Sequence, residues 1–212
     1  MEEKLDPYKW VNKHRLEFLA DGLFAIVITL LVLEIKVPVS ESIHSDAELL
    51  GLLKTQLPKF ASYIMSFIVL MMFWSVYVAQ FNHIEKCDRR LFLINIFLLF
   101  SVSLIPFSTA FLSEHIDFKL SVFVYWLNLM LMGLSMAIQW NHVYKNELLK
   151  KPSAEYAEHN KIFMIRGKTA MPLYTVGALL CFVSNYLSIG FIFMVQLAFA
   201  FGLDQKLRMR RS

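Results

Sequence analysis

Six long runs of apolar residues, separated by short polar segments, account for most of the chain. A helix needs roughly 20 mostly apolar residues to cross the hydrocarbon core of a bilayer, which is about 30 Å thick. The runs approach or exceed this length, so they predict an all-α polytopic membrane protein that forms one membrane domain over residues 1–212. The six predicted transmembrane helices cover residues 16–37, 58–81, 91–112, 120–144, 169–186 and 187–203.

Prolines and one turn set the expected limits of these spans. Pro38 should end the first span, and Pro58 is favourable as the first residue of the second. Pro106 lies inside the third span, where a missing backbone hydrogen bond should bend the helix or widen it locally. The last two spans are expected to form a tight hairpin around an uncharged turn at 184–188.

Two polar stretches between the spans still contain helical signals. Within residues 40–57, the run AELLGLLKTQL repeats its apolar positions at helical spacing and predicts a short interfacial helix. Residues 145–168 form the longest polar stretch, which we interpret as an amphipathic cytoplasmic helix or loop.

The distribution of positive charge predicts the orientation. Lys and Arg in short flanking segments favour the cytoplasmic side of a membrane. If the N-terminus is cytoplasmic and the chain crosses six times, both termini are cytoplasmic. Of the 21 Lys and Arg residues, the only ones then left outside are Lys36, Lys54, Lys59 and Lys119.

Composition agrees with a membrane protein and narrows the possible functions. The chain is 57% hydrophobic and 18% charged, which is too apolar for a soluble surface. Its net charge of +4 comes without a basic stripe interleaved with aromatic residues, so nucleic acid is not an expected partner. Cys87 and Cys181 are far apart and lack metal-ligand spacing, and no catalytic or phosphate-binding motif occurs. We therefore expect neither an enzyme nor a cofactor.

The first span carries the most informative side chains. Arg15 and Asp21 lie at its predicted cytoplasmic end, where an ionisable residue either marks a functional site or is simply hydrated among headgroups. Farther along, Ile26, Thr29 and Leu33 recur at spacings of three and four. Such a stripe could form a dewetted pore constriction, but spacing alone favours a buried helix whose threonine bonds to its own backbone.

The same residues resemble a known family. Arg15, three further residues and then Leu19-Ala20-Asp21-Gly22 are similar to the RxxxFSD signature of the lysosomal potassium channel transmembrane protein 175 and its bacterial homologues. Trp74, Asn95 and the step Ile105-Pro106-Phe107 fall where that family has a Trp, an Asn and a Leu-Pro-aromatic step. The resemblance covers most of the first three spans.

This resemblance implies a non-canonical tetrameric cation channel in which the first helix of each six-span subunit lines a central pore. Ile26 would then match the hydrophobic constriction, Thr29 a layer associated with potassium selectivity, and Leu33 a further apolar layer, with Leu30 as a neighbour. Potassium would pass Ile26 and Thr29 as a permeant ion, without a fixed metal ligand.

The resemblance also implies a hydrogen-bond network that holds the pore helix in place. Arg15 and Asp21 match its charged members, and Trp74 and Asn95 are the expected partners on the second and third spans. The chain departs from the family pattern elsewhere. Leu19 and Ala20 replace Phe-Ser, and Tyr77 stands where a Trp-x-x-His pattern has histidine, although a tyrosine can still donate one hydrogen bond.

Our leading hypothesis is therefore a homotetrameric potassium-selective channel in a bacterial cytoplasmic membrane, with membrane lipid and monovalent cations as partners. A small-solute or proton-coupled secondary transporter, with Asp21 as the protonatable group, is an alternative from a different class. A third possibility is a non-conducting membrane scaffold whose basic loops bind anionic lipid or a protein.

Overall fold

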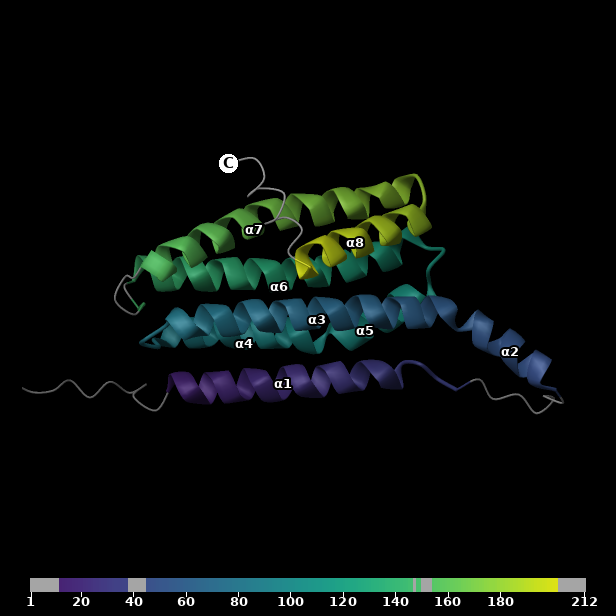
Figure 1. Ribbon diagram of the computed structural model, residues 1–212, viewed down its shortest axis with the longest axis horizontal. Helices are drawn as coiled ribbons and strands as arrows, with labels where there is room; N and C mark the ends of the chain where they lie inside the picture. Colours follow the sequence, from purple (N-terminus) through teal and green to yellow (C-terminus); the bar gives the residue numbers. More distant parts are fainter. Residues whose placement is uncertain (1–11, 38–44, 147, 150–153, 202–212) are drawn as a thin grey trace, which may run out of the picture.

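The protein is an elongated bundle of helices (Figure 1). The computed structural model describes residues 12–37, 45–146, 148–149 and 154–201. Helix α1 lies along one side, α3, α4 and α5 lie in the middle, and α6, α7 and α8 form the other side, while α2 projects from one end. The elements are α1 (Lys13–Leu33), α2 (Asp46–Thr55), α3 (Leu57–His83), α4 (Arg89–Ser103), α5 (Ile105–Glu114), α6 (Lys119–Lys145), α7 (Ala154–Leu179), the 3-10 turn η1 (Leu180–Phe182) and α8 (Asn185–Ala200).

The expectation of an all-helical membrane fold is confirmed. In the described part of the chain, four helical segments are long and apolar enough to cross a membrane: α1, α3, the α4–α5 pair over Arg89–Glu114, and α6. Helix α8 is apolar but shorter, at 16 residues. Helix α2 has no buried residue and matches the predicted interfacial helix in position.

The first three spans follow the prediction closely, with one correction. Helix α1 ends at Leu33, four residues before the predicted end, and Pro38 lies outside the described residues. Helix α3 has Pro58 in its first turn, as expected. At Pro106 the third span separates into α4 and α5 with Leu104 between them, because the proline nitrogen cannot continue the backbone hydrogen-bond ladder.

The last two spans differ more from the prediction. The turn lies at 180–184 rather than at 184–188, because the Ser184 hydroxyl caps α8 by accepting from the Leu187 amide. Helix α7 begins at Ala154, 15 residues before the predicted start of the fifth span at residue 169. The second part of the polar stretch 145–168 is thus the first half of α7, which agrees with the helix and not with the loop that we considered for this stretch.

A group of polar contacts fixes α4 against α6 at the end of the bundle where α3 ends. The Asp88 carboxylate accepts from the Leu91 amide at 2.7 Å and so caps α4. Its other oxygen lies 2.8 Å from Nε2 of His142 on α6. The backbone amides of Glu85 and Lys86 both donate to the Leu148 carbonyl. These contacts attach the start of α4, the helix that carries Asn95, to the end of α6.

Gly177 permits close packing between α7 and α8. Its carbonyl accepts from the Ser188 hydroxyl at 2.6 Å, and a Cβ at this position would lie 2.8 Å from Cγ1 of Ile192. We expect Gly177→Val to destabilise the hairpin by about 1–3 kcal/mol, the usual cost of overpacking. Thermal unfolding in detergent would measure the loss. Gly190→Val is the matched control, because a Cβ there meets nothing within 4 Å; equal effects of the two variants would contradict the packing argument.

Candidate functional site

Helix α1 packs into the bundle through a single face. Its buried side chains recur every three or four residues and contact α3, α4 and α5. This spacing gives the helix a continuous apolar attachment along its whole length. The residues of this buried face are Leu16, Ala20, Phe24, Val27 and Leu31.

The predicted pore residues lie on the other side of α1. Ile26 is 57% exposed and Leu33 is 68% exposed, although both are large and apolar. Thr29 and Leu30 are exposed as well. Helix α1 forms one edge of the bundle in Figure 1. The described residues of a single chain therefore leave this stripe uncovered, contrary to the buried helix that spacing alone favoured.

Thr29 combines a backbone hydrogen bond with exposure. Its hydroxyl donates to the Ile26 carbonyl at 2.7 Å, which is the local bond considered in the alternative interpretation. The hydroxyl hydrogen points back along the helix, so the oxygen lone pairs are left to face away from it. Oxygen lone pairs are the groups that can replace water around a cation.

The predicted network divides into two separate contacts. Trp74 on α3 donates its indole hydrogen to Asp21 Oδ1 at 2.8 Å and so connects α1 to α3. Asn95 on α4 contacts Tyr77 instead of Asp21, with 2.9 Å between the amide nitrogen and the phenol oxygen. Arg15 is exposed and makes no side-chain hydrogen bond or ion pair with the residues that the structure describes.

Tyr77 joins three helices and is the residue that the sequence-based network omitted. Its hydroxyl accepts from Asn95 and donates to the Leu16 carbonyl of α1 at 3.3 Å. The side chain is 1% exposed and stacks on Phe81 with 4.3 Å between ring centroids. The sequence did contain an indication that Tyr77 belongs to the network. Tyr77 follows Trp74 by three residues, and this spacing places both side chains on the same side of α3.

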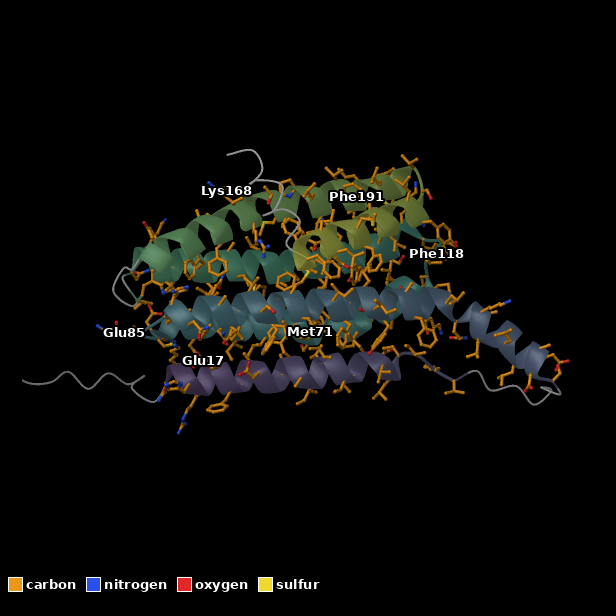
Figure 2. All side chains as sticks on the ribbon, viewed as in Figure 1. Glu17, Met71, Glu85, Phe118, Lys168 and Phe191 are labelled. Carbon is orange, nitrogen blue, oxygen red and sulfur yellow. The ribbon has the colours of Figure 1, made fainter. Side chains whose placement is uncertain are left out.

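An open hollow lies beside this network, between α1 and α3. Its volume is about 210 Å³, and its lining includes Glu17, Asp21 and Tyr77. The Glu17 carboxylate is paired with Lys13 at 3.4 Å and with His14 at 3.1 Å. Figure 2 shows Glu17 at the same end of the bundle as Glu85, with Phe118 at the opposite end. This end of α1 thus carries charged groups, whereas its exposed stripe beyond them is apolar except for Thr29.

Comparison with protein families gives a match over the part of the chain that contains this site. Residues 15–106 match the model of the family described as endosomal/lysosomal potassium channel TMEM175. A potassium channel of Streptomyces collinus is 34% identical over 82% of this chain and 85% of its own length. A potassium channel of Chamaesiphon minutus is 32% identical over 88% of this chain and 92% of its own length.

A solved structure agrees with the sequence comparison. The crystal structure of a lysosomal potassium-selective channel TMEM175 homolog from Chamaesiphon minutus superposes with a TM-score of 0.73 at 30% sequence identity. The similarity covers 89% of this chain and 96% of the other. The chain therefore belongs to the TMEM175 family, which is a family of ion channels and not of enzymes.

Proposed function

We propose that the protein is a subunit of a homotetrameric potassium-selective channel in a bacterial cytoplasmic membrane. The observation that carries this proposal is the exposed stripe of α1, in which large apolar side chains and one threonine are not covered by the described part of their own subunit. Two relatives whose similarity extends over most of this chain are named potassium channels, which supports potassium as the permeant ion.

A pore requires several copies of the chain. One subunit presents a single stripe, and four stripes around a common axis would enclose a narrow path. Ile26 would form an apolar ring that holds little water, so an ion must lose part of its hydration shell to pass. Thr29, about one turn farther along α1, would offer hydroxyl oxygens to the partly dehydrated ion. Leu33 would form a second apolar layer, with Leu30 beside it.

Six spans per subunit are the count that we propose. Helix α8 would be about 24 Å long at 1.5 Å per residue, somewhat short of a 30 Å hydrocarbon core. Its hairpin with the apolar second half of α7 supports treating these two helices as spans five and six. The positive charges near the spans favour cytoplasmic termini.

Asp21 supports a second candidate, a small-solute or proton-coupled transporter. Its carboxylate is exposed and lines the open hollow beside α1, as a carrier group would. Asp21→Asn distinguishes the two functions, because the amide oxygen can still accept from Trp74 but the side chain can no longer bind and release a proton. The channel proposal predicts that potassium flux into proteoliposomes persists in this variant. Saturable flux that stops in Asp21→Asn would support the transporter.

The direct experiment is potassium flux from liposomes that contain only this protein. We expect a flux that is selective for potassium over sodium, together with discrete single-channel current steps in planar bilayers. Empty liposomes and liposomes with heat-denatured protein serve as controls. A correctly folded preparation that carries neither flux nor current would contradict the proposal.

A further inference from the structure

Helix α6 buries a stripe that is mostly polar. Its positions recur at spacings of three and four and extend over about 31 Å, nearly the thickness of a bilayer core. All are at most 8% exposed, and Met132 is the only apolar side chain among them. The stripe consists of Ser121, Tyr125, Asn128, Met132, Ser135, Gln139 and His142.

Half of this stripe has partners within the bundle. His142 contacts Asp88, and Gln139 donates to Gln80 Oε1 at 3.2 Å. Ser135 donates to the Leu131 carbonyl at 2.6 Å. These contacts occupy the C-terminal half of α6, where the Gln139 amide oxygen is the one stripe atom left without a hydrogen-bond partner among the described residues. More unpaired atoms lie in the other half, around Tyr125 and Asn128.

Two of the hydroxyl groups near Tyr125 have no hydrogen left to donate. The Thr109 hydroxyl donates to the Ile105 carbonyl at 2.7 Å. The Ser66 hydroxyl lies 2.7 Å from the Thr109 hydroxyl and donates to the Tyr125 hydroxyl at 3.2 Å. Each hydroxyl group has one hydrogen, so only the Tyr125 hydrogen is left, and it can serve at most one neighbouring acceptor.

Two buried amides beside these hydroxyls lack partners. Gln196 on α8 is 0% exposed, and within the described residues neither its amide oxygen nor its nitrogen has a hydrogen-bond partner. Asn128 donates to Ser108 at 3.0 Å, but its oxygen has no donor. The Ser108 hydrogen is used for the Ile105 carbonyl. An amide without partners in a membrane interior is costly, because no bulk water reaches it.

The unpaired atoms define the chemistry of a ligand. Two oxygens need a hydrogen-bond donor, and the Gln196 nitrogen needs an acceptor. A potassium ion could satisfy the oxygens but not the nitrogen, and an anion could satisfy only the nitrogen. None of the side chains involved is charged, which also favours a neutral ligand. Water both donates and accepts, and buried waters typically bridge such groups.

We propose that each subunit binds ordered water at an inner polar site formed by Ser66, Thr109, Tyr125, Asn128 and Gln196. Water donates to the oxygens of Gln196 and Asn128 and accepts from the Gln196 nitrogen. The site lies between α3, α5, α6 and α8 and includes no residue of α1. The inference therefore does not depend on conduction through a central pore.

Radiolytic hydroxyl labelling of the full-length protein in lipid nanodiscs tests this site. A short X-ray pulse makes hydroxyl radicals from bound water, which modify adjacent side chains even where bulk solvent is excluded. We expect Tyr125 to be labelled although it is 0% exposed, and we expect its labelling to fall several-fold in Gln196→Met. Gln80→Met is the matched control, because this buried glutamine has a side-chain partner, and it should leave Tyr125 labelling unchanged.

An unlabelled Tyr125 in the wild type, or equal labelling in Gln196→Met, would overturn the proposal. If Gln196→Met does not fold, a high-resolution density map of the wild type decides instead. Density for water within hydrogen-bond distance of the Gln196 and Asn128 oxygens would support the site. A Gln196 amide bonded directly to Tyr125, with no such density, would overturn it.

Discussion

Replacing Ile26 by asparagine should lower the potassium-to-sodium permeability ratio by about tenfold, which corresponds to ~1.4 kcal/mol of lost discrimination. Ile26 is the large apolar side chain next to Thr29 on the exposed stripe of α1. An amide there would hydrate the constriction, so sodium, which loses its water less readily than potassium, would no longer be held back. Reversal potentials in planar bilayers under bi-ionic conditions measure the ratio.

The matched control is Leu93→Asn. Leu93 is 54% exposed, close to the value for Ile26, but it lies on α4 outside the proposed pore stripe. This variant should keep the wild-type ratio. Equal ratios in Ile26→Asn and the wild type, or equal changes in both variants, would show that the stripe of α1 does not set selectivity.

Removing the hydroxyl group of Tyr77 should lower the free energy of unfolding by about 1–3 kcal/mol, the usual cost of leaving a buried polar group unpaired. Asn95 is 0% exposed, and its oxygen already has no partner among the described residues. In Tyr77→Phe its nitrogen would lose its acceptor too, and the Leu16 carbonyl would lose its contact with α3. Thermal unfolding of the purified protein in detergent measures the change.

A double variant separates this explanation from a general loss of packing. In Tyr77→Phe/Asn95→Leu the unpaired amide is gone, and two apolar partners of similar size can be nearly neutral. We therefore expect the double variant to regain much of the stability that Tyr77→Phe loses. A double variant less stable than either single variant would indicate that the hydroxyl contact is not the cause.

The sequence predicts a span well where a single helix is apolar along most of its length. Apolar length identifies α1, α3, the α4–α5 pair and α6, and Pro106 correctly indicates the interruption between α4 and α5. The prediction is less definite for α7, because hydropathy alone left its polar first half open as either an amphipathic helix or a loop. The hairpin turn was misplaced because Ser184 and Ser188 are both polar, and only Ser184 is a helix cap.

The partners in the network depend on distances between helices, which one sequence does not contain. The composition of the network was predicted in part, since Asp21 contacts Trp74. The contact between Asn95 and Tyr77 depends on how far α4 is shifted along α3, which hydropathy and spacing do not give. Periodicity also could not show which side of α1 is covered, because both sides are apolar. The roles of Ile26, Thr29, Leu30 and Leu33 in conduction stay predictions.

The most direct test is thiol block of potassium flux in liposomes. Leu33→Cys would be made in a background where Cys87 and Cys181 are replaced by serine, and Leu93→Cys would be the control. If the exposed face of α1 lines the ion path, a charged, membrane-impermeant methanethiosulfonate should stop flux through Leu33→Cys and leave Leu93→Cys unaffected. Undiminished flux through a fully modified Leu33→Cys protein would contradict the account.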